Sequence, residues 1–599
     1  MVAHLSVPSL EPNESLPSSL SHKIITGLLK EKMGFKGLIV TDALNMKGSA
    51  DFSSSEEINL QAILAGNDLL DYPLEVKKSI ARFKKAHASG ELTDERLNES
   101  VRKILKTKYW MGLHAFSPLE KENLMADLNR PEDEVMNHKL VENSVTLVQN
   151  KGEILPIRNL DERKIAYVKL GTHINSAFVK RLNDYTQVDV IDSKNPAQLT
   201  QKLKAYNLVI FGFHTSLGAY ADYRISDEDL NILNSVAKTH DVILDVFASP
   251  YSLLKIDDFE NIEGVVVSYQ NTELAQDISA QMIFGAFDFK GMLPVNINDD
   301  FRVGYGLFQS GIQRMGYSVP EAVGLDRFKL NRIDSIARVV IDSSMAPGVQ
   351  VLVARRGKVV YRKSFGHYTY DKKKRVDNES IYDLASMTKI LGGLPMIIKA
   401  EEEGRFSLET SLGELMPVLK DSNKDTLTVK EALSHYARLK PYIPFYETMV
   451  EGDNSKPMPA YFRESKSDKF SIKVAENLYL RTDYRDTIYK LIAEAPQREE
   501  LDYKYSGLPF YLFPYYIERE YGKSLDELNE TYFYAPLGAT TLRYNPLNKF
   551  PKSRIVPTEQ DEFFRHQLLH GNVHDEGAAM MGGVSGNAGL FGTANYVAK

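Results

Sequence analysis

The stretch from Gly34 to Met46 constrains the N-terminal part of the chain most strongly. It reads Gly-Phe-Lys-Gly-Leu-Ile-Val-Thr-Asp-Ala-Leu-Asn-Met, and its apolar run, Leu38 to Val40, stands between a glycine and a Thr-Asp pair. Such a run predicts a short buried parallel strand that ends at Asp42. Barrel enzymes keep their chemistry at the carboxyl ends of such strands. We therefore predict Asp42 as a catalytic residue, and the alternative is that Asp42 caps the following helix.

Length and composition bound the classes that the chain can belong to. Its 599 residues exceed the roughly 250 to 300 at which single cores stop growing, so several domains are expected. The net charge of −7 comes without a basic cluster, which argues against a nucleic-acid partner. There is no cysteine, so disulfides and thiolate metal sites are excluded. We expect no metal and no cofactor.

The chain carries neither of the two sequence signals that place a protein at a membrane. No apolar run approaches the roughly 18 residues that a membrane span requires. The first residues lack both the basic and the apolar part of a signal peptide. The sequence therefore predicts no membrane span and no export signal, and it leaves the oligomeric state open.

The patterning predicts three domains of an α/β multidomain chain. Residues 1–112 hold two or three β/α units, with helices expected at 21–32, 54–65, 74–89 and 93–111. These units are too few for an eightfold barrel, which needs about 200 residues. After a linker at 113–131, residues 132–312 alternate strand-like apolar runs, starting at Val145, Ile165, Leu208, Val242 and Val265, with helix-length polar stretches. That alternation predicts a parallel, helix-covered sheet. A short linker near 313–320 precedes a third domain, which opens with a β-hairpin around Gly357.

Ser386 and Lys389 form a candidate catalytic pair in the third domain. At the start of a helix, a separation of three residues places both side chains on one face, within reach of each other. A desolvated lysine can lose its proton and draw one from serine, while the helix N-terminus favours developing negative charge. The alternative is an ordinary helix N-cap with an exposed lysine.

Four segments of the first 112 residues resemble the last third of a glycoside hydrolase family three barrel: 3–5, 20–30, 34–46 and 65–68. The β-N-acetylhexosaminidase branch fits best. The resemblance implies that Asp42 is the nucleophile of a retaining mechanism and that the general acid/base is a His outside this chain. Segments 142–150, 155–157 and 291–295 resemble the sandwich domain of the same enzymes, which is usually scaffold. We accordingly read His214 and Asp245, two polar residues in strands of that domain, as structural.

The third domain resembles the class C β-lactamase and penicillin-binding-protein superfamily. The resemblance rests on the hairpin, on Ala385 to Lys389, on 427–435 and on Tyr503 to Gly507. It implies that Ser386 attacks an acyl carbonyl while Lys389 and Tyr505 manage its proton. Gly507 departs from the Asn or Asp usual at that place, and the Lys/His-Thr-Gly motif expected after residue 593 is not reached. We therefore expect a chain truncated at both ends, with little turnover by itself.

Taken together, the sequence predicts a partial (β/α)8 barrel, an α/β sandwich and a β-lactamase-like α+β domain at 321–599. The predicted activity is retaining release of terminal β-linked N-acetylhexosamine, with peptidoglycan fragments as the expected substrate and the cell envelope as the location implied by resemblance. The alternatives are a serine acyl hydrolase, that is an esterase, peptidase or β-lactamase-like enzyme acting through Ser386, or a non-catalytic penicillin-binding module. We read His574-Asp575-Glu576 as a polar loop edging the serine site, because three adjacent residues cannot all point at one metal ion.

Overall fold

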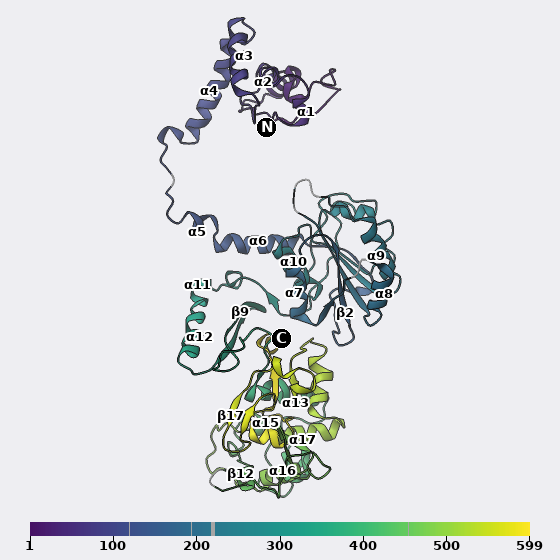
Figure 1. Cartoon of the computed structure of the whole chain (residues 1–599), viewed down its shortest axis with the longest axis vertical. Coiled ribbons are helices and arrows are strands. Elements are labelled where there is room, and N and C mark those ends of the chain that lie inside the picture. The colour runs from purple at the N-terminus through teal and green to yellow at the C-terminus, as the bar shows by residue number, and fades with distance from the viewer. Residues whose placement is uncertain (119, 193–194, 217, 219–221, 453–454) are drawn as a thin grey trace. The chain divides into compact units, whose positions relative to one another are not determined.

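The computed structural model describes residues 1–118, 120–192, 195–216, 218, 222–452 and 455–599. The chain divides into two compact units, Met1–Leu128 and Asn129–Lys599. The boundary between them falls inside the segment 113–131, which the sequence predicts as a linker. Figure 1 shows the two units along the chain.

The first unit is built mainly of helices. They are a π-helix at Lys23–Lys32 and the α-helices α1 (Lys47–Ala50), α2 (Ser55–Ala65), α3 (Val76–Ala88), α4 (Asp94–Trp110) and α5 (Leu124–Leu128). The helices predicted at 54–65, 74–89 and 93–111 are confirmed by α2, α3 and α4. The start of α4 is fixed by Thr93, whose side chain accepts a hydrogen bond from the Arg96 amide.

The strand predicted at Leu38 to Val40 is present only as single parallel bridges. Val2 pairs with Thr41 and Val40 pairs with Leu69. Three chain segments thus lie parallel, with Ile39 buried between them. Each segment pairs at too few residues to form a ladder, and the described part of this unit shows no closed barrel, as its length predicts.

The second unit begins with a six-stranded sheet in the order β1-β6-β5-β4-β2-β3. Its strands are β1 (Thr146–Asn150), β2 (Ile165–Gly171), β3 (Val188–Val190), β4 (Leu208–His214), β5 (Asp241–Phe247) and β6 (Gly264–Val267). The helices α7 (Ser176–Tyr185) and α10 (Glu273–Ile283) cover one face, and α8 (Pro196–Leu203) and α9 (Asp227–Ala237) cover the other (Figure 1). α6 (Pro131–Ser144) leads into β1.

The predicted parallel sheet is confirmed for five strands and is wrong for β1. β1 pairs antiparallel with β6, whereas β2, β3, β4, β5 and β6 run parallel. An edge strand entered directly from a helix needs no crossover connection, so its direction is not set by the βαβ rule. β3 was not predicted, because Val-Asp-Val is too short to be recognised as an apolar run.

His214 and Asp245 are fully buried in this sheet and have hydrogen-bond partners there. His214 Nε2 lies 2.9 Å from the Tyr167 hydroxyl, and Nδ1 lies 2.7 Å from Asn271 Oδ1. Burial lowers the pKa of His214 to about 4. Asp245 accepts hydrogen bonds from Ser268 and Ser279, and burial raises the pKa of Asp245 to about 7. The structural interpretation of both residues therefore agrees with their surroundings.

The raised pKa of Asp245 predicts a pH-dependent stability of this domain. The stabilising, protonated form is fully present below about pH 4, and its contribution of about 4 kcal/mol is lost as the pH rises through about 7. Asp245→Asn keeps the shape and cannot ionise, so the stability of the natural protein relative to this variant should fall between pH 4.5 and pH 7.5. Urea unfolding at the two pH values measures the difference. An unchanged difference would show that Asp245 is ionised in the folded protein. Burial lowers the pKa of His214, so the contribution of His214 to stability changes with pH in the opposite direction. This contribution is the same in both proteins and cancels in the difference between them.

The rest of the second unit contains the predicted hairpin and a largely helical lobe. The hairpin consists of β8 (Gly348–Arg355) and β9 (Lys358–Gly366). A short strand, β7 (Gly316–Tyr317), lies in the segment predicted as a linker and pairs with β9. A second sheet has the order β10-β19-β16, from β10 (Tyr382–Asp383), β19 (Leu590–Gly592) and β16 (Arg543–Tyr544).

The other helices are α11 (Arg327–Leu330), α12 (Arg332–Asp342), α13 (Leu394–Glu402), α14 (Leu412–Leu415), α15 (Val429–Leu433), α16 (Tyr484–Glu494), α17 (Pro509–Tyr521), α18 (Leu525–Asn529), α19 (Glu576–Met580) and α20 (Ala594–Ala598). The short strands are β11 (Val450–Glu451), β12 (Lys456–Pro457), β13 (Phe462–Arg463), β14 (Ile472–Ala475), β15 (Leu478–Leu480), β17 (Glu559–Asp561) and β18 (Gln567–Leu569).

Asp184 at the end of α7 joins the sandwich to the hairpin and to α20. Its carboxylate accepts a hydrogen bond from Arg181 within the sandwich at 2.7 Å and one from Arg362 of β9 at 2.6 Å. Its carbonyl accepts one from the Asn595 amide, and Asn595 in turn accepts one from the Tyr317 hydroxyl at 2.6 Å. The buried ion pairs and hydrogen bonds explain why the second unit does not separate into two.

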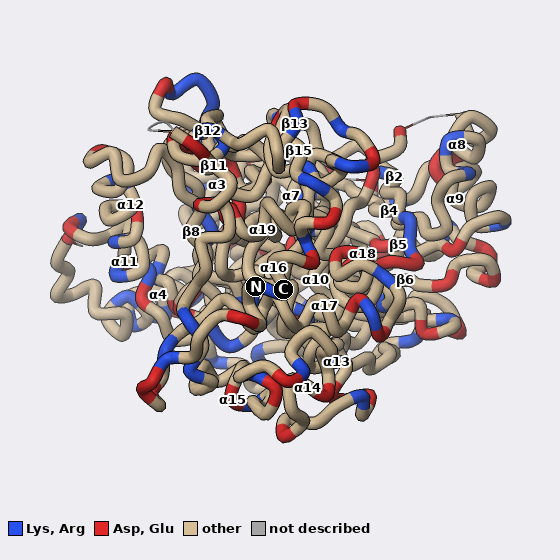
Figure 2. The backbone as a smooth tube through the Cα atoms, turned by 90° about the horizontal axis from the view of Figure 1, so that it is seen from below, with Lys and Arg blue, Asp and Glu red and all other residues tan. Residues whose placement is uncertain are grey.

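Lys and Arg residues and Asp and Glu residues are interspersed over the backbone (Figure 2). This mixture agrees with the small net charge of the sequence. Over the described ranges, none of the helices has the length and apolar character that crossing a bilayer requires.

Candidate functional site

Ser386 stands on a strained turn that follows β10. Ala385 has φ of 46°, in the left-handed region that non-glycine residues rarely adopt. Asp383 holds this turn, because its Oδ1 accepts a hydrogen bond from the Ala385 amide at 2.9 Å. Ser386 lies within a 3-10 turn, Ala385–Met387, and its side chain reaches the surface. The turn therefore presents the hydroxyl outward, and Ser386 does not cap a helix.

Lys389 lies beside Ser386 and is almost completely buried. Lys389 begins a π-helix, Lys389–Gly393, and only 7% of it is exposed, so the alternative of an exposed lysine is wrong. Its Nζ donates to Ser386 Oγ at 2.9 Å and to the carbonyl of Asn587 at 3.0 Å. It also lies 5.3 Å from the centre of the Tyr505 ring. Two of the three donors of the ammonium thus have acceptors here.

The phenol of Tyr505 completes the group around Ser386. Burial opposes its ionisation, but the nearby Lys389 and Ser386 side chains and the Lys389 charge outweigh burial, so the pKa of Tyr505 is lower than usual. The ring of His435 lies 4.8 Å from that of Tyr505. Burial and the Lys389 charge lower the pKa of His435, which favours its neutral form. The structure thus brings together the three residues predicted for this domain, Ser386, Lys389 and Tyr505.

Gly507 leaves space beside this group. A Cβ at Gly507 would meet no atom closer than the Pro441 carbonyl oxygen at 3.9 Å. Its amide donates to that same carbonyl at 3.0 Å. A glycine is therefore not required here for steric reasons, and its effect is to leave the site without a side-chain amide.

The polar run at 574–576 contacts the site, as the sequence predicts. The His574 amide donates to Asp383 Oδ2 at 2.9 Å, and its Nδ1 lies 3.3 Å from the same oxygen. That hydrogen bond raises the pKa of His574. Asp575 instead caps α19, through a hydrogen bond from the Ala578 amide. Among the described residues, no group of His, Asp and Glu is arranged to hold a metal ion.

Sequence reasoning missed Asp383 and Asn587, which hold the nucleophile turn and the lysine. Asn587 is separated from Lys389 by 198 residues, and it acts through its main-chain carbonyl, which any residue could supply. Asp383 stands three residues before Ser386. An acidic residue at the end of a predicted strand is a signal that could have found it.

Asp42 lies at the carboxyl end of the bridged segments of the first unit. Its amide donates to the Val2 carbonyl at 2.8 Å, and its Oδ1 accepts from the amide of Ala43 at 2.9 Å. The interpretation as a helix cap is wrong, because α1 begins at Lys47 and Met46 precedes it. The carboxylate is partly exposed. The structure places no second carboxylate or histidine against Asp42 by a hydrogen bond among the described residues.

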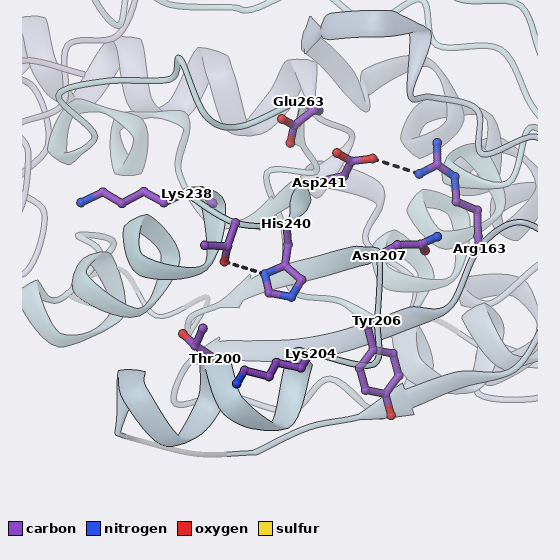
Figure 3. A pocket seen from close by; sticks show the side chains of 11 residues that line it. Arg163, Thr200, Lys204, Tyr206, Asn207, Lys238, His240, Asp241 and Glu263 are labelled. Atoms are coloured by element: carbon purple, nitrogen blue, oxygen red, sulfur yellow. Dashed lines mark hydrogen bonds and ion pairs between the residues drawn. The ribbon is translucent and has the colours of Figure 1, made fainter.

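A large hollow in the sandwich, of about 840 Å³, does not resemble a site (Figure 3). It lies at the amino ends of β2, β4 and β5, whereas open α/β sheets bind ligands at the carboxyl ends. Several of its polar groups already have partners: Arg163 pairs with Asp241 at 2.9 Å, and His240 contacts Thr239 and the Leu203 carbonyl. A more apolar hollow, of about 420 Å³, lies next to the nucleophile turn and is lined in part by Leu384 and Met387.

Proteins with solved structures resemble the chain only in part. A β-glucoside phosphorylase, BglX, matches at 21% identity with a TM-score of 0.44, over 50% of this chain and 57% of that one. A glycoside hydrolase family 3 β-N-acetylglucosaminidase from Paenibacillus sp. str. FPU-7 matches at 21% identity with a TM-score of 0.39, over 49% and 57%.

Relatives and family models agree on the serine domain. Proteins of Salmonella paratyphi A and Salmonella newport, described provisionally as D-alanyl-D-alanine carboxypeptidases, are 29% identical over 299 residues. The match covers 45% of this chain and 63% of theirs, so it spans less than two thirds of their length. Residues 334–599 match the Beta-lactamase family model, and residues 1–107 match the model of the glycosyl hydrolase family 3 N terminal domain. The chain thus combines glycosyl hydrolase family 3 sequence at its N-terminus with a β-lactamase domain at its C-terminus.

Proposed function

We propose that the C-terminal domain is a serine acyl hydrolase with Ser386 as nucleophile. One observation carries the proposal: an exposed serine lies 2.9 Å from a buried lysine that also donates to the Asn587 carbonyl, next to a tyrosine with a lowered pKa. Buried titratable groups with such specific partners are typical of functional sites. A domain kept only for binding would not need this arrangement.

The proposed reaction passes through an acyl-serine intermediate. The ionised Tyr505 phenol accepts the proton of Ser386 while the Ser386 Oγ forms a bond to the acyl carbonyl carbon. The bond from that carbon to the leaving group then breaks, and the leaving group takes the proton from Tyr505. Tyr505 then accepts a proton from a water molecule that attacks the acyl carbon, the bond from that carbon to Ser386 Oγ breaks, and Ser386 Oγ takes the proton back from Tyr505. The charge of Lys389 favours the ionised form of Tyr505 in this scheme.

Gly507 supports an ester as the preferred acyl substrate. A substrate with an amide side chain would find no side-chain hydrogen-bond partner at position 507, and unpaired buried polar groups lose affinity. The relatives' name adds peptides ending in D-alanine as a second class for assay. Cell-wall fragments contain such peptides together with β-linked N-acetylhexosamine, which suits a chain with both family matches.

Covalent labelling tests the proposed nucleophile directly. A fluorophosphonate and a fluorescent penicillin should each label the protein, and peptide mass spectrometry should place the adduct on Ser386. Ser386→Ala should abolish labelling, whereas the control Ser434→Ala, on an adjacent helix end, should not. Labelling at another residue, or none at any concentration, would refute the assignment.

A second function, retaining glycoside hydrolysis through Asp42, is favoured by the family match of residues 1–107. Asp42 lies where parallel segments end, and its main chain is fixed by Val2. In the proposed step, its carboxylate attacks the anomeric carbon of a terminal β-linked N-acetylhexosamine, and a separate acid protonates the leaving oxygen.

Asp42→Asn should reduce the hydrolysis of a chromogenic N-acetylglucosaminide by about 10³-fold, because the amide is a poor nucleophile. The control Asp51→Asn changes an exposed carboxylate in the same region and should have no effect. A fluorosugar that traps the glycosyl-enzyme should label Asp42. Full activity in Asp42→Asn would end the assignment of this nucleophile.

A further inference from the structure

A hydrogen-bonded cluster that the proposed reaction does not use joins the loop after α19 to the start of α19 and to α17. The cluster consists of Asp575, Asn587, Tyr511 and Ser585. Each of them is at least partly buried, and Asn587 is only 4% exposed. Its position matters because the main-chain carbonyl of Asn587 is one of the two acceptors of Lys389.

The side chain of Asn587 is held by three partners at once. Its Nδ2 donates to Asp575 Oδ1 at 3.1 Å and to the Tyr511 hydroxyl at 3.0 Å. Its Oδ1 accepts from the Ser585 hydroxyl at 2.6 Å. Both donors and the acceptor of the amide are therefore satisfied, which leaves a single orientation for this residue.

Asp575 is in turn fixed independently of Asn587. Its Oδ1 caps α19 by accepting from the Ala578 amide at 2.7 Å, and it lies 3.4 Å from the Tyr511 hydroxyl. One end of the cluster is thus a helix terminus, and the other end is the carbonyl that touches the catalytic lysine.

We propose that Asp575 and the side chain of Asn587 are positioning residues, which hold the Asn587 carbonyl against Lys389 and so keep Lys389 within reach of Ser386. The inference rests on the proposed acyl hydrolase function. Neither side chain approaches Ser386 by a hydrogen bond, so their effect should fall on kcat and not on substrate binding. A shift of about 1 Å in a reacting group costs up to about 100-fold in rate.

A donor and acceptor exchange tests the proposal. Asn587→Asp faces Asp575 with a second carboxylate and should lower kcat for a chromogenic ester by about 100-fold, with KM nearly unchanged. The double variant Asp575→Asn with Asn587→Asp restores one donor opposite one acceptor and keeps a cap for α19, so kcat should return to within about 10-fold of the natural protein. Asn477→Asp, at an exposed position, is the matched control.

The measurement must separate positioning from folding. Rates are expressed per Ser386 titrated with a fluorophosphonate, so unfolded molecules do not contribute to the rate per active site. Asn587→Ala gives a second variant, which removes the amide and adds no charge. Loss of Ser386-dependent turnover in the natural protein would refute the proposed function itself. If the natural protein is active and either Asn587→Asp retains kcat within about 3-fold or the exchange brings no recovery, the positioning role is refuted.

Discussion

Lys389→Met should lower kcat/KM for an ester substrate by about 10³-fold, the largest effect on activity that the structure predicts. The substitution removes the hydrogen bond to Ser386 and also the charge that lowers the pKa of Tyr505. With that charge gone, the pKa of Tyr505 should rise. The acidic limb of the pH profile of any residual activity should therefore move to higher pH.

Methionine is chosen because its length and apolar character suit the buried position between the rings of Tyr505 and Phe510. The control is Lys430→Met, an exposed lysine paired with Glu409 in the same domain. Thermal unfolding of both variants shows whether the fold is intact. A folded Lys389→Met enzyme that keeps more than about a tenth of the activity would exclude Lys389 from the reaction.

Arg565→Met should have the largest effect on stability, lowering the free energy of unfolding of the serine domain by about 3–5 kcal/mol. The side chains of Arg565 and Asp561 are both fully buried, and Arg565 Nε lies 2.5 Å from Asp561 Oδ2. Arg565 also donates to the carbonyls of Val573 and His574. The variant leaves a buried carboxylate without its counter-charge and two carbonyls without their donor.

Urea unfolding and calorimetry of the whole chain measure this effect in the transition of the second unit. Arg481→Met is the matched control, since Arg481 pairs with Asp483 at the surface and should change the midpoint little. Adding Asp561→Asn to Arg565→Met removes the unpaired charge and should recover part of the loss. Equal midpoints for Arg565→Met and Arg481→Met would show that the buried pair is not a structural support.

Local pattern was sufficient to predict much of the sandwich and half of the serine site. The apolar runs that begin at Ile165, Leu208 and Val242 are strands, because a central parallel strand is buried on both faces and must be apolar throughout. The direction of β1 could not be predicted in this way. Its residues suit either direction, and pairing with β6 at the sheet edge decides it.

What the sequence by itself determined is therefore short-range: the helices α2 to α4, the central strands of the sandwich, and the reach of Lys389 to Ser386, which backbone geometry fixes over three residues. Only the tertiary structure decided which distant groups meet there. The packing of separate elements brings Tyr505 and the carbonyl of Asn587 to Lys389. It also brings the His574 amide to Asp383. The physical reason is that spacing along a chain sets local neighbours, whereas convergence of remote residues depends on how whole helices and strands bury their apolar faces.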